Sequence, residues 1–186
     1  KQIAYFCLML VTASLLIEVI IQFFLPQDNV PVISEPAYGI PRAPLANLDI
    51  DMSNHRNYPL YHIITNSKRI RSQKEIPYSK PSETYRILCL GDSVFFGIGV
   101  NNNELFSNHL ENLLNVSKNK TRYEVINASA VGWGLLEYAT FLKNEGYKYS
   151  PDLVILSIYP DDIRQNFVDF ISWERLESFE ETIILK

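Results

Sequence analysis

The chain has 186 residues, of which 47% are hydrophobic, 12% aromatic and 20% charged. This composition excludes a disordered or fibrous protein and suits one ordinary domain with appendages. Lys and Arg total 17 against 21 Asp and Glu, a formal net charge of −4, so no basic field indicates nucleic acid as a partner. Cys7 and Cys89 lie in apolar runs without paired metal ligands, which argues against a disulfide framework and against zinc. We expect no cofactor.

Residues 1–25 are predicted to form a transmembrane helix. A helix over the apolar run of 23 residues from Ile3 to Leu25 would be about 35 Å long, enough to cross a hydrocarbon core. A cleaved signal peptide is disfavoured because the run is long and has no small-residue cleavage site, and a buried core helix of this length normally keeps a polar face. The clearly polar residues of the run are Thr12, Ser14, Glu18 and Gln22.

The charges that flank this run predict its orientation. Lys1 precedes the run, whereas the first charged residues after it, Asp28 and Glu35, are acidic. This asymmetry favours a cytoplasmic N-terminus. The prediction is a single-pass membrane protein, with the rest of the chain outside the cytoplasm.

Glu18 and Gln22 are one helical turn apart and therefore share a face of the predicted span. An intramembrane carboxylate is costly and usually meets a partner or water. The pair therefore predicts either a position near the outer interface or a contact with another membrane subunit, and both alternatives stay open.

Residues 26–83 hold eight of the ten prolines, a spacing that leaves no sustained helical or strand period. We predict an irregular, largely extended extracytoplasmic tether, with parts of it packed through tyrosines. A basic cluster in this stretch favours a solvated face over a site for anionic headgroups or an acidic substrate. The tyrosines are Tyr38, Tyr58, Tyr61 and Tyr78, and the basic residues are Lys68, Arg69, Arg71 and Lys74.

Residues 84–186 have the pattern of an α/β domain, in which strands alternate with helices. The strands are apolar nearly throughout, which is typical of a parallel sheet covered on both faces, and we predict a doubly wound, flavodoxin-like sheet. In such sheets the chemistry lies where the strands end. The predicted strands are 85–90, 123–127 and 152–159, and the predicted helices are 104–118 and 133–147.

Each predicted strand ends in residues suited to a site. The first ends in Gly91-Asp92-Ser93, where glycine permits a tight turn and places a serine at the start of the next helix. The second leads through residues 127–131 to Gly132, where glycine lets the backbone turn and direct an N–H into the crevice. The third ends in Asp161-Asp162. Each could be a simple turn, but three polar strand ends at one crevice favour an active site.

The same three blocks resemble the SGNH (GDSL-type) hydrolase family of the membrane-anchored bacterial type. RILCLGDSVFFGIGV is similar to its first block, YEVINASAVGWG to its second, and PDLVILSIYPDD occupies the place of its third. The resemblance covers roughly residues 63–166. It implies that Ser93 has the nucleophile position, supported by Gly91 and Asp92, and that Gly132 provides an oxyanion N–H.

Two departures from the family put its chemistry in doubt. Asp161 stands where the family has its oxyanion Asn, and an ionised carboxylate would repel the developing oxyanion. The family's base belongs to a late Asp-x-x-His block, whereas the last histidine here is His109. The 186 residues therefore correspond to the N-terminal half of such a domain, and we predict that this chain by itself is inactive.

Two functions remain. The first is a serine esterase or deacetylase that acts on acylated glycans or lipids. The second is a non-catalytic single-pass subunit or scaffold of a larger membrane complex, which would explain Asp161, the missing histidine and Glu18 together. A nucleotide-binding flavodoxin-like domain is disfavoured, because no Gly-rich phosphate motif follows a strand.

Overall fold

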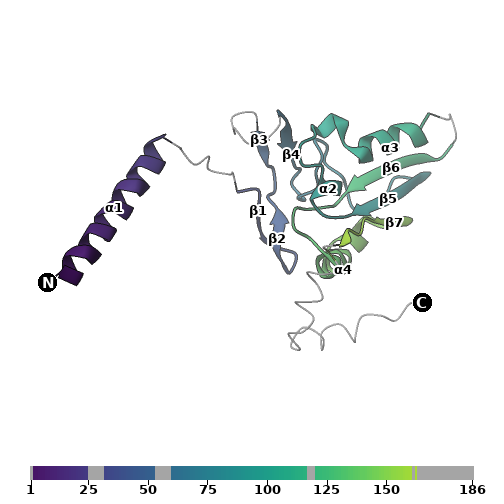
Figure 1. The fold of residues 1–186 in the computed structure, drawn as a ribbon. Helices are drawn as coiled ribbons and strands as arrows, with labels where there is room; N and C mark the ends of the chain where they lie inside the picture. The colour runs from purple at the N-terminus through teal and green to yellow at the C-terminus, as the bar shows by residue number, and fades with distance from the viewer. Residues whose placement is uncertain (1, 25–31, 53–59, 117–119, 161, 163–186) are drawn as a thin grey trace, which may run out of the picture. The chain divides into compact units, whose positions relative to one another are not determined.

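The computed structural model describes residues 2–24, 32–52, 60–116, 120–160 and 162 (Figure 1). The chain divides into two compact units, one of residues 1–31 with 54–57 and the other of residues 32–53 with 58–186.

The first unit contains α1 (Gln2–Phe24), a helix of 23 residues. The helical conformation agrees with the prediction. Large apolar side chains along the helix are exposed, between 50% for Leu10 and 80% for Ile3. Among the described residues, no helix is both long enough and apolar enough to cross a membrane.

The second unit is built on a three-stranded sheet of β5 (Thr84–Leu90), β6 (Arg122–Asn127) and β7 (Leu153–Leu156). Its order is β6-β5-β7, and β5 is parallel to both neighbours. The predicted α/β class with a parallel sheet is confirmed. All three strands start within one residue of the predicted positions, because apolar runs specify buried strands well, although β7 ends three residues earlier than predicted.

Helices cover both faces of this sheet. Alternate residues of β5 point to opposite faces, so Ile87 and Cys89 belong to one apolar cluster and Leu88 and Leu90 to another. The first cluster includes residues of α3 (Phe106–Leu114), and the second includes residues of α4 (Leu135–Asn144). Three short helices complete this part: α2 (Ser93–Phe96), η2 (Asn102–Glu104) and η3 (Gly146–Tyr149).

The outer edge of β6 is capped by side chains of α3 and the residue after it. Asn115 bonds both backbone groups of Tyr123, donating to its O at 2.9 Å and accepting from its N at 2.9 Å. The carboxylate of Glu111 accepts from the N–H of Val125 at 2.9 Å. These side chains take the place of a neighbouring strand.

Residues 26–83 differ from the predicted irregular tether, because they contain four short strands. These form two antiparallel hairpins, β1 with β2 and β3 with β4. Both strands of a two-stranded hairpin are edge strands, and proline is tolerated in edge strands and at bulges. Pro36, for example, lies at the register shift of β1. The strands are β1 (Ser34–Ala37), β2 (Ile40–Pro44), β3 (Asp49–Asp51) and β4 (His62–Ile64).

This segment also contributes to the core, so the compact domain begins at residue 32 rather than at the predicted 84. Ile40 and Ile70 are buried in the same cluster as Leu88 of the sheet. The predicted packing of tyrosines is confirmed for Tyr38, Tyr61 and Tyr78, while Tyr58 lies outside the described residues. Figure 1 shows both hairpins at the end of the parallel sheet to which its strands point.

The basic cluster does not form one solvated face. Arg71 is 2% exposed, and its guanidinium donates to the carbonyls of Phe96 at 2.9 Å, Gly97 at 2.5 Å and Val100 at 2.5 Å. It therefore holds the loop that follows α2. Arg69 pairs with Glu35 and Lys68 with Glu75, while Lys74 is exposed.

Candidate active site

The end of β5 places Ser93 on the first turn of α2. Asp92 caps this helix, because its carboxylate accepts from the N–H of Val94 at 2.9 Å. Ser93 is half-buried. A Cβ at Gly91 would lie 2.5 Å from the Cβ of Phe95, so the turn between strand and helix requires glycine at this position.

The loop after β6 runs beside the loop after β5. Ala128 donates to the carbonyl of Cys89 at 2.9 Å, and Ala130 donates to the carbonyl of Gly91 at 3.1 Å. The chain then turns at residues 130–133, where Gly132 has a φ of +74° at the third position, as a type II turn demands. The Gly132 turn therefore lies next to the segment that carries Ser93.

The third strand ends at the same end of the sheet as the first two. Ser157 donates to the carbonyl of Leu90 at 2.9 Å, which continues the pairing of β7 with β5. Asp162 is 6% exposed, and its carboxylate accepts from the hydroxyl of Tyr138 at 3.1 Å and from the N–H of Tyr159 at 2.8 Å. Burial, followed by the charge of Asp162, raises the pKa of Tyr138, so this phenol stays protonated and donates.

The structure thus brings the segments of Ser93, Gly132 and Asp162 together at the carboxyl ends of the three strands. Asp161, at the position of the family's oxyanion Asn, lies outside the described residues. Tyr138, which joins α4 to Asp162 beyond β7, was not singled out in the sequence.

Arg42 is a second residue that sequence reasoning missed. It belongs to β2, and its Nη2 donates to the carbonyl of Gly132 at 3.3 Å. In return, the indole Nε1 of Trp133 donates to the carbonyl of Arg42 at 2.6 Å. No sequence signal pointed to it, because the contact joins residues 90 positions apart and its segment read as a tether.

The histidines do not supply a base to Ser93 among the described residues. His62 contacts the carboxylate of Asp49. Neighbouring residues of a strand point to opposite sides, so His62 points away from the side on which Ile63 packs with Phe96 of α2. His109 belongs to α3, and no hydrogen bond joins it to Ser93 in the described part of the chain. His55 lies outside the described residues.

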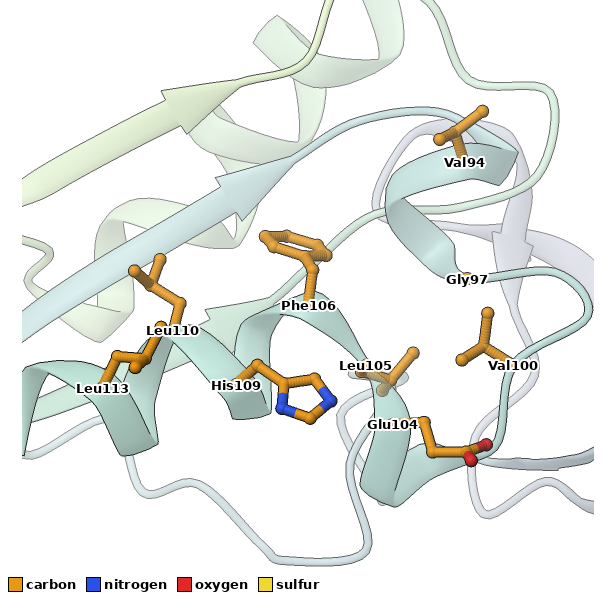
Figure 2. Close-up of a pocket in the computed structure, with 9 residues that line it drawn as sticks. All are labelled: Val94, Gly97, Val100, Glu104, Leu105, Phe106, His109, Leu110 and Leu113. Carbon is orange, nitrogen blue, oxygen red and sulfur yellow. The ribbon is translucent and has the colours of Figure 1, made fainter.

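An apolar groove of about 480 Å³ is lined by Val94, the residue after Ser93, but not by Ser93 itself. Figure 2 shows Val94 on α2, Gly97 and Val100 on the segment after it, and the other lining residues from the end of η2 along α3. Val94 is 68% exposed and Leu113 is 71% exposed, so both apolar side chains are available for contact. The lining residues are Val94, Gly97, Val100, Glu104, Leu105, Phe106, His109, Leu110 and Leu113.

Comparison of the chain with protein-family models, with curated proteins and with solved structures finds no match in any of the three.

Proposed function

We propose that residues 32–186 belong to an SGNH-type hydrolase domain whose site is built for ester hydrolysis. The observation that supports this proposal is the pair of backbone bonds from Ala130 to Gly91 and from Ser157 to Leu90, which holds three loops side by side. The strand order β6-β5-β7, with helices on both faces, is the arrangement expected of a doubly wound, flavodoxin-like sheet.

In the proposed reaction, Ser93 attacks the ester carbonyl and forms an acyl-enzyme as the C–O bond to the alcohol breaks and the alcohol leaves with a proton from the base. Water then attacks the acyl-enzyme, releases the carboxylic acid and restores the Ser93 hydroxyl. The N–H groups of Gly132 and Ser93 hold the oxyanion. The Ser93 proton must pass to a base, and a serine hydroxyl without one is a weak nucleophile. Because no histidine follows His109, the 186-residue chain is inactive by itself and needs an Asp-x-x-His segment supplied to it.

The substrate class that suits the site is an acylated glycan or lipid. The apolar groove that includes Val94, the residue after Ser93, would offer a surface for the acyl part. An alternative is a non-catalytic membrane subunit, which is favoured by a carboxylate at Asp161, where an amide should donate to the oxyanion.

In this proposal, residues 3–25 anchor the domain in a bacterial inner membrane, with the domain in the periplasm. The support is the apolar run from Ile3 to Leu25 in the sequence and the exposed apolar side chains of α1; the finding that no described helix is long and apolar enough to cross a membrane does not support it. Glu18 and Gln22 lie in α1 and would share the face that meets a membrane subunit. Protease added to spheroplasts should remove the residues after about Pro26, and full protection of the domain would overturn this orientation.

The catalytic proposal is tested with a fluorophosphonate probe, with Ser93→Ala as the matched control. We expect no labelling of the 186-residue chain, and Ser93-dependent labelling once a C-terminal half with Asp-x-x-His is fused to it. Strong labelling of the unmodified chain would show that another base serves the site. A correctly folded fusion that stays unlabelled would favour the non-catalytic subunit.

A further inference from the structure

Arg42 places a guanidinium group against the turn that the proposed reaction uses for the oxyanion. Its backbone carbonyl is fixed by Trp133 at 2.6 Å, and its Nη2 donates to the carbonyl of Gly132 at 3.3 Å. That turn is bonded in its own right to the Ser93 loop, through Ala130 and Gly91 at 3.1 Å. Arg42 is thus connected to the nucleophile loop through one turn.

The guanidinium covers Gly132 with its face. A Cβ added to Gly132 would lie 3.3 Å from the central carbon of the guanidinium and 3.4 Å from each Nη of Arg42. These three nearly equal distances mean that the planar group lies broadside to the glycine. Nη2 donates to the carbonyl of Gly132, and the other N–H groups, which lie in the same plane, have no partner among the described residues.

The charge of Arg42 is not neutralised within the described part of the chain. The side chain is exposed, and of its five N–H donors only one is used, in the bond to Gly132. Arg69, which packs on the same hairpin, provides the contrast: it pairs with Glu35 at 2.6 Å and donates to Pro44 at 2.8 Å. Arg42 therefore has donors to offer to a ligand where Arg69 does not.

We propose that Arg42 is an anion-binding residue of the Ser93 site and that the site selects esters that carry a carboxylate or phosphate near the acyl group. A planar guanidinium binds either oxyacid through two parallel N–H bonds, so the two groups share one recognition chemistry. The selection of an ester rests on the proposed function, whereas the binding of the anion does not need the nucleophile. For an exposed charged pair, we expect a preference of about fivefold to tenfold.

The test is equilibrium binding to the full chain in detergent micelles, with Ser93→Ala as the background so that no probe is consumed. Methyl hydrogen succinate is compared with dimethyl succinate, and 2-acetoxyethyl phosphate with 2-acetoxyethanol. We expect the charged member of at least one pair to bind about fivefold to tenfold more tightly. The pair that shows the preference identifies carboxylate or phosphate as the natural group.

Arg42→Gln should abolish the preference, and Arg42→Lys, which keeps the charge without the planar fork, should retain part of it. Arg122→Gln is the matched control, because Arg122 is exposed at the start of β6, at the opposite end of the sheet strand from the site. An unchanged preference in Arg42→Gln, or no saturable binding of either charged ester, would overturn the inference.

The outcome is separable from the proposed function. A preference that depends on Arg42, in a fusion whose Ser93 stays unlabelled, would keep the anion site and reject the hydrolase. Labelling of Ser93 without any such preference would reject the anion site alone.

Discussion

Replacing Arg71 tests whether the segment before β5 is held to the site loop by one buried side chain. Arg71 is 2% exposed, and its guanidinium carbon lies 4.8 Å from the centre of the Phe96 ring. Burial lowers the pKa of its guanidinium to about 10, which leaves it charged at neutral pH. Besides three loop carbonyls, it donates to the carbonyl of His62 and to the side chain of Asn102, both at 3.3 Å.

The expected cost of Arg71→Met follows from these bonds. Each buried acceptor that loses a charged donor costs about 1–3 kcal/mol, and neighbouring losses do not add fully. A cleft of about 400 Å³, lined in part by Arg71, lets water replace some of the donors. We therefore expect a loss of about 3–5 kcal/mol, a large share of the stability of an ordinary domain.

The assay is urea unfolding of the full chain in non-ionic detergent, followed by the fluorescence of the buried Trp133. Arg71→Lys, which keeps the charge but has three donors, should lose less and stays measurable if Arg71→Met does not fold. The exposed Arg122→Met is the control and should change stability by no more than about 0.5 kcal/mol. A free energy of unfolding for Arg71→Met within about 1 kcal/mol of the wild type would refute the reasoning.

Four further outcomes are expected. Gly132→Ala should destabilise the domain by about 1–2 kcal/mol in urea unfolding, since its φ of +74° strains alanine; a gain in stability would contradict this. Burial raises the pKa of the Cys89 thiol to about 12, so the stability that the neutral thiol provides is complete below about pH 9 and is lost as the pH rises toward 12. Cys89→Ala should reduce this loss of stability by up to about 1.4 kcal/mol per pH unit, and equal slopes in the two proteins would contradict the prediction. Asp161→Asn alone should leave hydrolysis of an acetyl ester at background, because the base is still missing, and measurable turnover would disprove that. Glu18→Leu should weaken co-purification of membrane partners while insertion is kept; unchanged recovery would leave only the interfacial position.

The parallel sheet was predictable because its signal is local. The run from Tyr85 to Leu90 is apolar over consecutive positions, and the glycine and serine that end it mark the turn without any distant information. The exception within it is Arg86, which is fully buried because Glu124 and the carbonyls of Tyr78 and Tyr149 surround it. Such partners become visible only when the chain is folded.

The hairpins before the sheet could not be predicted, because their strands have three to five residues and their contacts are distant. Asn144 donates to the carbonyl of Tyr38 at 2.7 Å across 106 positions, and Arg42 meets Gly132 across 90. Proline-rich sequence without a period is equally compatible with a solvated tether. For the same reason, the sequence predicted that the three strand ends lie together, but it did not predict Arg42, which covers Gly132.

Because the outer edge of β6 is capped by side chains, the sheet can be extended by a further strand only beside β7. Asn115 and Glu111 occupy the backbone groups that an incoming strand would need, so strand addition at that edge would have to displace three hydrogen bonds of 2.9 Å. At the opposite edge, β7 carries the exposed Leu153 and Leu156, 43% and 49% accessible. A strand that extends this sheet, from this chain or another, would therefore pair with β7, the strand that leads to Asp162.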